Sequence, residues 1–544
     1  EEESHSRDVT LRTLGYATDN GAYYYYWTGP NKSHTYDDVM REVKAYSREA
    51  NIPYRYVQLD SWWYYRQDGS DKAGVPLSGV TNWTAMPSVF PEGGLPGLYE
   101  NITHWPVMAH NRYWATNNVY ASNPQEAVGP TAYTGKKFEF AWGYGAGLPL
   151  SEEFWDYLFT INDNWGLVNY LQDWLSLTTN SMPQLTTNVT FGREWLRQMG
   201  RGAAMHNVAV LYCMSFPRHV FQALEVPSVT QARASNDYQA GSMGDDHDQW
   251  RIGDSSLFVT ALGLAPSKDN YWSMSTPQFT PHYDPIWKIR ETRNRLESLT
   301  STLSNGIVQI SDRVGFTNRT LVVRACDAGG RLLRPATAAT PINRYYSARA
   351  FGASSDNGNI TGVAHSTYST VAEGHPSHGY LFFAKQTQLL SVNPLLDLPQ
   401  PMLRDAARGA VSGWLAYEAN TTSSLPFVNA SLAATQLVIP PTDEYTFQFW
   451  TLVPVPTGAS IVLVGEQDKW IAGSAQRFSA VERWGTSMSV VASGAAGEEI
   501  HVSFAAVDGN SRMTGLIVAA CTVGESLAVK VIASASGSFS CEAQ

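Results

Sequence analysis

The stretch Val168-Asn169-Tyr170-Leu171-Gln172-Asp173-Trp174 is typical of a short buried strand that ends abruptly in polar residues. Similar stretches recur over the first 335 or so residues, with helical patterns between them. Strands that alternate with helices indicate βα units and a parallel sheet. Eight such strands predict a (β/α)₈ TIM barrel, a fold in which the C-terminal ends of the strands carry the chemistry. The candidate strands are Thr13–Asp19, Tyr54–Asp60, Trp105–Arg112, Leu167–Asp173, Asn207–Met214, Ser228–Asp237, Asn270–Ser273 and Ile307–Asp312.

Helical segments fit between these strands. In Thr35–Ala50 the apolar residues recur at helical spacing, and the same kind of pattern predicts helices over Gly192–Ala204, Arg218–Glu225 and Pro285–Ser304. The segment from Val119 to Leu150 breaks the rhythm, because it is rich in Gly, Pro, Tyr and Phe. We expect this segment to be a long loop that caps the barrel mouth.

The character of the chain changes from about Ser347, where helical periodicity fades and Val, Thr and Ser dominate. This pattern predicts an all-β sandwich domain after the barrel. We therefore expect a catalytic barrel over residues 1–340 and a C-terminal β-sandwich over residues 341–544. The expected strands are Gln436–Ile439, Tyr445–Val453, Ser460–Val464, His501–Ala506, Leu516–Ala520 and Leu527–Ile532.

The composition narrows the class of partner. Charged residues make up 16% of the 544 residues, against about 25% in typical soluble domains, while 18 Trp and 28 Tyr are present. Exposed aromatic rings stack on sugars, although a Trp-rich core explains the same count. The net charge of −11 and the absence of a basic run argue against nucleic acid as a partner. No apolar stretch is as long as the 18 or more residues of a membrane span.

The cysteines and the glycosylation sequons bear on the cellular compartment. None of the four cysteines forms a CxxC pair, so no structural zinc site is expected. Cys521 and Cys541 flank the last expected strands and could bridge, whereas Cys213 lies in an apolar run and is predicted to be a buried free thiol. Eight N-x-S/T sequons favour a secreted or lysosome-like glycoprotein. They begin at Asn31, Asn82, Asn101, Asn188, Asn318, Asn359, Asn420 and Asn429.

Two aspartates at strand ends are the candidate catalytic residues. Asp173 ends a buried strand, where a carboxylate is costly to bury without a function or a partner. Asp237 follows Arg233 by four residues across another strand end. Glycoside hydrolysis needs two carboxylates, one to attack or to activate water and one to act as the acid. The alternatives are that Asp173 is a helix cap or part of a buried ion pair, and that Arg233 and Asp237 only fix a loop.

Further polar and aromatic residues are expected to bind the substrate. Asp60 precedes Trp62 and Trp63, a pattern that suits hydroxyl binding with ring stacking, although a capping role for Asp60 remains open. His110 extends the polar rim, and Gln172 and Trp174 flank Asp173. The run Asp245-Asp246-His247-Asp248 resembles a metal site in composition alone, and we expect a solvated acidic loop there, with no metal and no cofactor.

Several of these segments, in their order along the chain, resemble motifs of the α-galactosidase and raffinose-synthase superfamily, clan D of the glycoside hydrolases. The resemblance covers roughly residues 12–335, and the superfamily's barrel is also followed by a β-sandwich. The matching segments are Leu14-Gly15-Tyr16-Ala17-Thr18-Asp19, Val57-Gln58-Leu59-Asp60-Ser61-Trp62-Trp63, Phe90-Pro91-Glu92-Gly93-Gly94-Leu95, Tyr170-Leu171-Gln172-Asp173, Arg233-Ala234-Ser235-Asn236-Asp237-Tyr238, Val308-Gln309-Ile310-Ser311-Asp312-Arg313-Val314-Gly315 and Arg331-Leu332-Leu333-Arg334-Pro335.

The resemblance implies retaining hydrolysis or transfer of an α-linked sugar. It makes Asp173 the nucleophile and Asp237 the acid/base, with Arg233 and Asp60 as ligands of sugar hydroxyls and Asp19 in the pocket lining. The family commonly has Lys where this chain has Leu171, and an acidic pair where it has Asp60-Ser61. Both changes remove groups that hold galactose hydroxyls, so the sugar is not assigned.

We therefore expect a secreted glycoside hydrolase whose substrate is an oligosaccharide, a polysaccharide or a glycoconjugate. Two alternatives stay open at this stage. One is a transglycosylase, in which a second sugar replaces water as the acceptor. The other is a sugar-binding relative that has lost catalysis. The sequence does not predict the oligomeric state.

Overall fold

The computed structural model describes residues 7–23, 34–61, 63–67, 79–128, 133–240, 251–276, 278, 290–352, 360–420, 427–430, 437–443 and 445–544. Trp62 and the acidic run 245–248 lie outside the described residues. The chain forms two compact units. The first comprises Glu1–Gln249, Phe258–Asn294 and Gly306–Arg319, and the second comprises Trp250–Leu257, Arg295–Asn305 and Thr320–Gln544.

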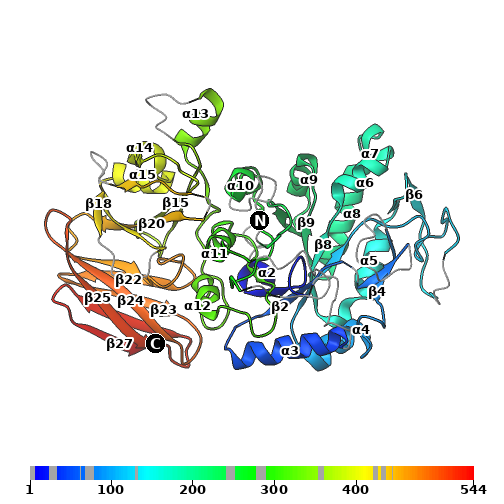
Figure 1. Ribbon diagram of the computed structural model, residues 1–544, viewed down its shortest axis with the longest axis horizontal. Helices are drawn as coiled ribbons and strands as arrows, with labels where there is room; N and C mark the ends of the chain where they lie inside the picture. The colour runs from blue at the N-terminus through cyan, green and yellow to red at the C-terminus, as the bar shows by residue number, and fades with distance from the viewer. Residues whose placement is uncertain are drawn as a thin grey trace. The chain divides into compact units, whose positions relative to one another are not determined.

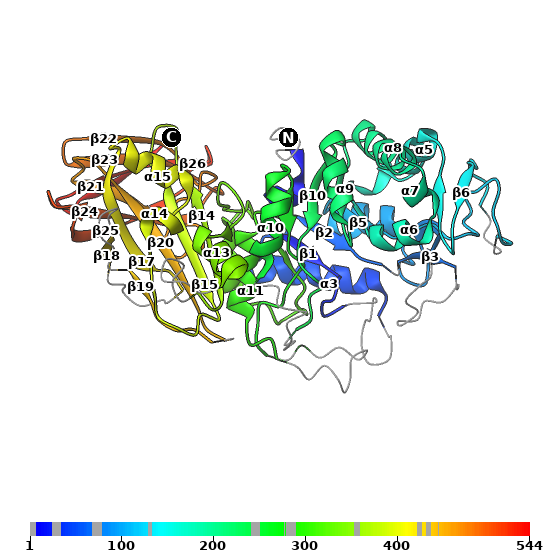
Figure 2. The same cartoon turned by 90° about the horizontal axis from the view of Figure 1, so that it is seen from above.

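The first unit is built on eight parallel strands, as predicted (Figures 1 and 2). Seven parallel pairings give the order β11-β10-β9-β8-β5-β2-β1-β12. A parallel bridge between Tyr271 and Ile310 joins the two ends, and the Tyr271 amide donates to the Gln309 carbonyl at 3.2 Å. The sheet therefore closes into a barrel. Its strands are β1 (Gly15–Ala17), β2 (Tyr56–Leu59), β5 (Val107–Asn111), β8 (Leu167–Gln172), β9 (Ala209–Tyr212), β10 (Val229–Arg233), β11 (Ala265–Ser267) and β12 (Gln309–Ile310).

In the first unit, the helices from α3 (Tyr36–Glu49) to α9 (Pro217–Gln222) lie between barrel strands along the chain and outside them in space (Figure 2). The predicted helix after β1 is confirmed as α3, and Thr35 begins it with a capping box to Asp38. The predicted helices over Gly192–Ala204 and Arg218–Glu225 are confirmed as α8 and as α9 with η4. The helical elements are α2 (Val9–Arg12), α3 (Tyr36–Glu49), α4 (Gly94–Gly97), η2 (Leu98–Thr103), α5 (Glu152–Thr160), η3 (Asp163–Trp165), α6 (Leu175–Ser181), α7 (Gln184–Thr187), α8 (Phe191–Met205), α9 (Pro217–Gln222), η4 (Ala223–Glu225), α10 (Ile252–Ala261), α11 (Asn294–Leu303), α12 (Arg319–Val322) and η8 (Val323–Ala325).

The barrel interior is a packed core. Its apolar cluster consists of Leu11, Tyr56, Met108, Leu171, Leu211, Cys213, Ala265 and Ile307. Asp8, which is buried, accepts hydrogen bonds from Thr230 at 2.6 Å and Gln231 at 3.0 Å. The segment before β1 is thereby tied to the sixth strand, and it adds Leu11 of α2 to the barrel core.

Two parts of the barrel differ from the prediction. The seventh strand was expected at Asn270–Ser273, but β11 spans Ala265–Ser267, and Tyr271 makes a single bridge. The segment Val119–Leu150 contains a hairpin of β6 (Phe140–Trp142) and β7 (Gly147–Pro149), so it is not a loop throughout. A second hairpin, of β3 (Tyr64–Arg66) and β4 (Val80–Ala85), follows β2. Both hairpins extend βα connections beyond the C-terminal ends of barrel strands.

The second unit contains antiparallel sheets, and the six strands predicted from the sequence are confirmed as β19, β20, β21, β24, β25 and β26. One sheet has six strands in the order β13-β14-β15-β20-β17-β18, and β16 pairs with β19. Their bounds are β13 (Thr340–Pro341), β14 (Val363–Ser369), β15 (His378–Ala384), β16 (Leu390–Ser391), β17 (Val411–Glu418), β18 (Val428–Ala430), β19 (Val438–Ile439) and β20 (Phe447–Pro456). Three helices were not anticipated: α13 (Asn343–Phe351), α14 (Pro394–Asp397) and α15 (Gln400–Ala407).

The last strands form a β-sandwich. The sheets β21-β24-β25 and β22-β23-β26-β27 enclose one apolar core that includes Leu463, Val490 and Phe504. Cys521 on β25 and Cys541 on β27 form a disulfide. These strands are β21 (Ile461–Gly465), β22 (Phe478–Trp484), β23 (Ser487–Ser493), β24 (Glu499–Val507), β25 (Met513–Thr522), β26 (Ala528–Ser534) and β27 (Phe539–Ala543).

Candidate active site

The described candidate residues all lie at the C-terminal ends of barrel strands. Asp173 directly follows β8, the fourth strand of the barrel. Arg233 is the last residue of β10, the sixth strand, and Asp237 lies four residues beyond it. Asp19 and Asp60 follow the first two strands, His110 is part of the third, and Gln172 and Trp174 flank Asp173. The barrel therefore gathers at one edge residues that are up to 218 positions apart, from Asp19 to Asp237.

Asp173 is held by hydrogen-bond donors on both of its carboxylate oxygens. The Trp174 amide donates to Oδ1 at 2.6 Å, and Nε2 of His110 lies 3.1 Å from Oδ2. Burial raises the pKa of Asp173, but its hydrogen-bonding and charge interactions with His110, and the hydrogen bonds from the Trp174 amide and the Cys213 thiol, together outweigh it and lower the pKa below its ordinary value. Because 16% of the side chain is exposed, the Asp173 carboxyl group is still open to a ligand.

His110 contacts protein groups through both ring nitrogens. Nδ1 lies 2.8 Å from the hydroxyl of Tyr64, and Nε2 contacts Asp173. The Tyr64 and His110 rings are nearly parallel, at 8° with centroids 6.0 Å apart, and both side chains are buried. Both ring nitrogens of His110 are thus engaged by side chains of the protein.

The two neighbours of Asp173 differ in their contacts. Gln172 is buried, and its amide donates to the backbone carbonyls of Arg112 at 3.3 Å and Asp173 at 2.9 Å. Trp174 is half-buried in a left-handed backbone conformation with φ of 60°, and the guanidinium of Arg112 lies 4.9 Å from its ring centroid. Trp174 therefore offers a ring surface near the nucleophile candidate, while Gln172 supports the backbone.

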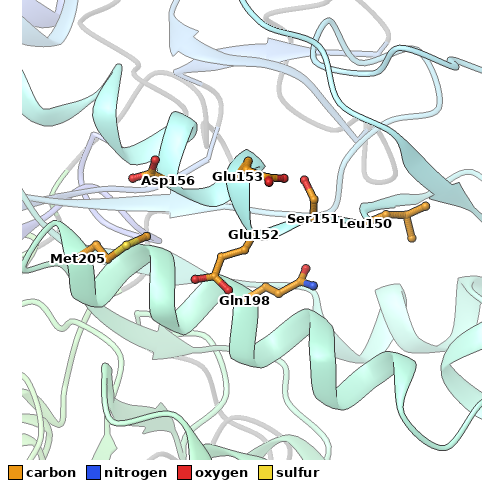
Figure 3. Close-up of a pocket in the computed structure, with 7 residues that line it drawn as sticks. All are labelled: Leu150, Ser151, Glu152, Glu153, Asp156, Gln198 and Met205. Atoms are coloured by element: carbon orange, nitrogen blue, oxygen red, sulfur yellow. The ribbon is translucent and has the colours of Figure 1, made fainter.

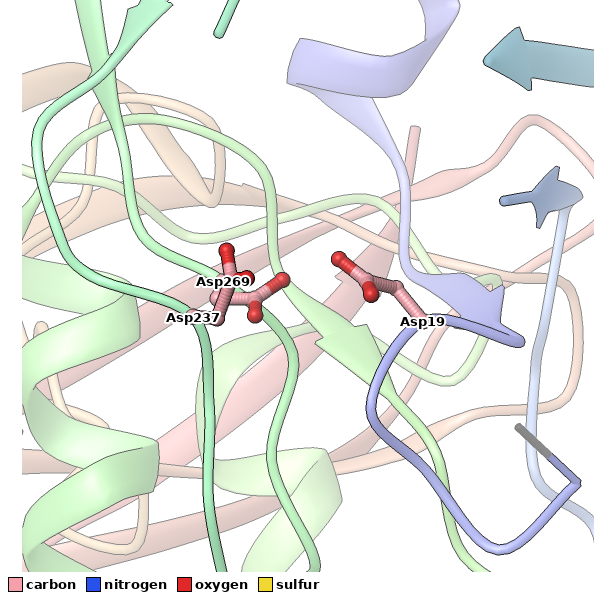
Figure 4. A group of neighbouring side chains, drawn as sticks. All are labelled: Asp19, Asp237 and Asp269. Atoms are coloured by element: carbon pink, nitrogen blue, oxygen red, sulfur yellow. The ribbon is translucent and has the colours of Figure 1, made fainter. Parts of the chain in front are cut away.

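Arg233 lies among three carboxylates (Figure 4). Its Nη2 is 3.0 Å from Asp269, 3.3 Å from Asp237 and 3.4 Å from Asp19. Figure 4 shows Asp237 and Asp269 side by side, with the Asp19 carboxylate pointing toward them. Carboxylate oxygens of the three residues lie within 4.8 Å of one another, a spacing that could hold a metal ion. The guanidinium of Arg233 already supplies a positive charge to all three.

The loop that carries Asp237 is tied to the end of the seventh strand. The Ala234 amide donates to the Ser267 carbonyl at 2.9 Å, and the Tyr238 amide donates to the Asp269 carboxylate at 2.6 Å. The Asp269 amide in turn donates to the Ser235 hydroxyl at 3.0 Å. Asp237 is thereby fixed from both sides although it lies beyond the strand.

The environment of Asp237 favours its protonated form. Desolvation raises the pKa of Asp237 to about 6, against the lowering effect of Arg233, and the charges of Asp269, Asp173 and Asp60 add to the rise. The side chain itself is 65% exposed, so water reaches the carboxyl group directly and limits how much desolvation alone can contribute. Asp237 is thus an accessible acid with a pKa above that of an ordinary aspartate.

Asp19 and Asp60 line the same edge of the barrel. Burial raises the pKa of Asp19 well above its ordinary value, and the charges of Asp269 and Asp60 add to the effect. Asp60 is buried, and its oxygen accepts from the Ser61 amide at 2.6 Å and the Ser61 hydroxyl at 3.1 Å. Its amide donates to the Thr18 hydroxyl at 3.0 Å, which links the first two strand ends.

Sequence reasoning missed Asp269, Tyr64 and the role of Cys213 as a donor to Asp173. Asp269 was not predicted because β11 is only three residues long and contains Pro266. The seventh strand was therefore expected after β11, and Asp269 did not stand at its end. The polar pair Asp269-Asn270, which follows Leu264 and Ala265 after three intervening residues, was the available signal.

A surface depression of about 530 Å³ lies elsewhere, over α5 and α8 (Figure 3). Glu152, Glu153 and Asp156 give it an acidic lining, and its other lining residues are Leu150, Ser151, Gln198 and Met205. It contains none of the candidate residues, and helices α5 and α8 lie on the outside of the barrel. We therefore do not assign it to the active site.

Comparison with known proteins shows that the chain is similar to several solved structures. The chain is similar to a glycoside hydrolase of family 5 from Bacteroides vulgatus ATCC 8482, with 7% identity and a TM-score of 0.37 over 81% of this chain and 88% of that one. It is also similar to a family 30 endoxylanase from Clostridium papyrosolvens C71, with 10% identity and a TM-score of 0.33 over 81% and 96%. A trimodular family 5 endoglucanase gives 9% identity and a TM-score of 0.31 over 100% and 99%.

All three are glycoside hydrolases, and none is described as an α-galactosidase or a raffinose synthase. No family model matches the sequence, and no curated protein matches it significantly. Among the described residues, no helix has the length and apolar character needed to cross a membrane.

Proposed function

We propose that the chain is a retaining glycoside hydrolase that acts on an α-linked sugar, with Asp173 as the nucleophile and Asp237 as the acid/base. The proposal rests on two carboxyl groups at one edge of the barrel, one directly after β8 and one in the loop after β10, whose surroundings shift their pKa values in opposite directions. The pKa of Asp173 is lowered, and that of Asp237 is raised to about 6. A pair of carboxyl groups whose pKa values are pushed apart is the arrangement that lets one attack while the other donates a proton.

The proposed reaction has two steps. Asp173 attacks the anomeric carbon while the glycosidic C–O bond breaks, and Asp237 gives its proton to the departing oxygen. Asp237, now ionised, then takes a proton from a water molecule. The oxygen of that water attacks the anomeric carbon and releases the Asp173 carboxylate.

The surrounding groups support sugar binding at the same edge. Arg233, Asp60 and Asp19 are proposed to bind hydroxyls, with Trp62 and Trp174 as stacking rings and His110 and Gln172 in the pocket wall. Leu171 packs in the barrel core, where the α-galactosidase family commonly has Lys. The α-linkage rests on the motif resemblance, and the sugar is left to experiment.

The test is hydrolysis of a panel of aryl α- and β-glycosides by the wild type, Asp173→Asn and Asp237→Asn. The panel should include galactosides, glucosides, N-acetylhexosaminides, fucosides and arabinosides. Asp156→Asn, at the exposed depression on α5, is the matched control. We expect release from one α-glycoside, its loss in both active-site variants, and retention in the control.

Turnover that survives in Asp173→Asn would overturn the proposal. Turnover of a β-glycoside alone would overturn the α-linkage. Product formed only with an added sugar acceptor would instead identify a transglycosylase, and binding without turnover would identify a sugar-binding protein.

We also propose that the protein follows the secretory route. The Cys521–Cys541 disulfide supports this, because disulfides persist in oxidising compartments. Three of the described sequon residues, Asn101, Asn188 and Asn429, are exposed and open to a glycan. Mass spectrometry of the native protein before and after enzymatic deglycosylation is the test, and unmodified Asn101 and Asn188 peptides would contradict the proposal.

A further inference from the structure

We infer that Tyr64 and His110 form a positioning pair that orients the Asp173 carboxylate, so that His110 acts on the reaction through Asp173 and not by contact with the sugar. The inference rests on the proposed function for its catalytic meaning. Its structural basis is a chain of two contacts, from the Tyr64 hydroxyl to Nδ1 of His110 at 2.8 Å and from Nε2 to Oδ2 of Asp173 at 3.1 Å.

The pair comes from two elements that meet at the barrel edge. Tyr64 begins β3, the first strand of the hairpin after β2, and His110 lies near the end of β5. The indole of Trp83 on β4 donates to the His110 carbonyl at 3.0 Å and holds the backbone at this point. Tyr64, Trp83 and His110 are all buried, so the geometry is fixed by packing.

The contacts assign the tautomer of His110. Burial raises the pKa of Tyr64, so the phenol keeps its proton and, at 2.8 Å from Nδ1, is placed to donate it to that nitrogen. The ring proton of the neutral imidazole then lies on Nε2, where it points to Asp173. The other tautomer would place the Nε2 lone pair against a carboxylate oxygen. In other proteins, too, a carboxylate or carbonyl that accepts from one ring nitrogen fixes the orientation of a histidine.

The pair restricts Asp173 because its donors divide between the two oxygens. The Trp174 amide binds Oδ1 and His110 binds Oδ2, so the carboxylate cannot rotate without breaking one of these hydrogen bonds. A nucleophile held in one orientation keeps the geometry needed for attack.

Other charged or titratable groups also face Asp173. Arg112 from the end of β5 and the Cys213 thiol after β9 favour its ionised form. Asp237, from the loop after β10, is a like charge near it. Asp60, after β2, acts on both Arg112 and Asp237. These groups remain when His110 is replaced, so loss of His110 is expected to raise the pKa of Asp173 without making it an uncharged residue at neutral pH.

The experiment compares His110→Ala, His110→Gln and Tyr64→Phe with the wild type. The first readout is the pH profile of kcat/KM on an activated aryl glycoside, whose acid limb reports Asp173. In His110→Ala we expect this limb to move up by roughly one to two pH units, the size of a lost hydrogen bond to a charged group. His110→Gln should restore most of the shift, because its amide can donate to Oδ2.

The second readout needs no activity. The carboxyl ¹³C resonance of Asp173, assigned by its loss in Asp173→Asn, is titrated in each variant, and the ring ¹⁵N resonances of His110 report its tautomer. In the wild type we expect a neutral imidazole with its proton on Nε2. In Tyr64→Phe we expect the Nδ1 resonance to move toward the position of a ring nitrogen that accepts no hydrogen bond. His206→Gln is the control, because His206 pairs with the exposed Asp156 at 3.0 Å.

The outcomes separate the two claims. A raised pKa of Asp173 in His110→Ala in a protein that hydrolyses no glycoside supports the pair and removes the proposed function. An unmoved Asp173 titration in His110→Ala, or an Nδ1–H tautomer in the wild type, overturns the pair whatever the activity. A rise in KM with a fixed acid limb would show that His110 contacts the sugar. If His110→Ala does not fold, two measurements still test the pair. They are the tautomer of His110 in the wild type and the ¹⁵N resonances of His110 in Tyr64→Phe, a variant that removes only one oxygen.

Discussion

Nη2 of Arg233 lies 3.0 Å from Asp269 and 3.3 Å from Asp237, so the nearer of these two partners is not the proposed acid/base. With Asp19 at 3.4 Å, one positive charge serves three carboxyl groups. Three neighbouring carboxylates around a single guanidinium repel one another, which favours proton uptake by at least one of them. Asp237 is the member of the group that water reaches, and it is therefore placed to hold a proton that it can transfer.

Replacing Asp269 with Asn is predicted to lower the pKa of Asp237. The like charge of Asp269 raises that pKa, and its removal also leaves Arg233 freer to stabilise ionised Asp237. Both effects have the same sign, so the alkaline limb of the kcat/KM profile should move to lower pH. The asparagine oxygen can still accept from the Tyr238 amide, which keeps the loop in place. An alkaline limb at higher pH than in the wild type would show that Asp269 does not act through its charge.

The wild type is predicted to have a bell-shaped pH profile centred below pH 6. Activity needs Asp173 ionised and Asp237 protonated, and the pKa of Asp237 is raised to about 6 while that of Asp173 is lowered. The descending limb of kcat/KM should therefore lie near pH 6. Rates measured from pH 3 to pH 9 on an activated substrate check this, and an optimum above pH 7 would not fit the assigned roles.

Asp312 is predicted to make the protein less stable as the pH rises toward neutrality. Burial raises the pKa of Asp312 to about 7, although Ser273 and Gln278 donate hydrogen bonds to it. Because the folded state binds this proton more tightly than the unfolded state, the stabilisation is complete below about pH 4 and is lost as the pH rises through 7. The change is on the order of 2–4 kcal/mol.

Thermal unfolding between pH 4 and pH 8 tests this prediction. In Asp312→Asn the decrease in Tm over this range should be smaller than in the wild type, because asparagine does not titrate. Asp163→Asn, at an exposed site, should keep the wild-type dependence. Equal slopes for Asp312→Asn and the wild type would count against a buried protonated carboxyl group.

Loss of the Cys521–Cys541 disulfide is predicted to destabilise the terminal sandwich and to leave catalysis intact. The two cysteines are 20 positions apart, and cross-linking a loop of this length stabilises a fold by about 3 kcal/mol in the chain-entropy model. Denaturant unfolding of Cys521→Ser beside the wild type measures the loss, and adding a reductant to the variant should change nothing further. A variant as stable as the wild type would show that β25 and β27 are held by pairing alone.

Much of the barrel could be predicted because many of its strands are apolar runs that end in a polar residue. Asp60, Asp173 and Arg233 each follow or close an apolar run, and the structure places all three where the sequence did. The Phe90-Pro91-Glu92-Gly93-Gly94-Leu95 segment leads into helix α4, and Gly93 and Gly94 at its start have φ of 88° and 65°, values that favour glycine.

The rest depends on contacts between distant segments, which a single sequence does not reveal. β11 has three residues, one of them proline, so its sequence carries little strand pattern. Its pairing with β10 is what identifies it as a strand. The hairpins of β3 with β4 and β6 with β7 lie within polar, glycine-rich or aromatic stretches. The contact of Tyr64 with His110 spans 46 positions, and no local spacing signals it.

The central claim is that Asp173 is the nucleophile and Asp237 the acid/base. The most direct test is to rescue Asp173→Gly and Asp237→Gly with azide on an activated aryl α-glycoside. The configuration of the glycosyl azide that each variant forms is then determined. Without the nucleophile, azide must displace the leaving group directly, so Asp173→Gly should yield the β-azide. Without the acid/base, the glycosyl-enzyme still forms and azide then attacks it, so Asp237→Gly should yield the α-azide. The reverse pair of products, or the same configuration from both variants, would contradict the assignment of the two aspartates.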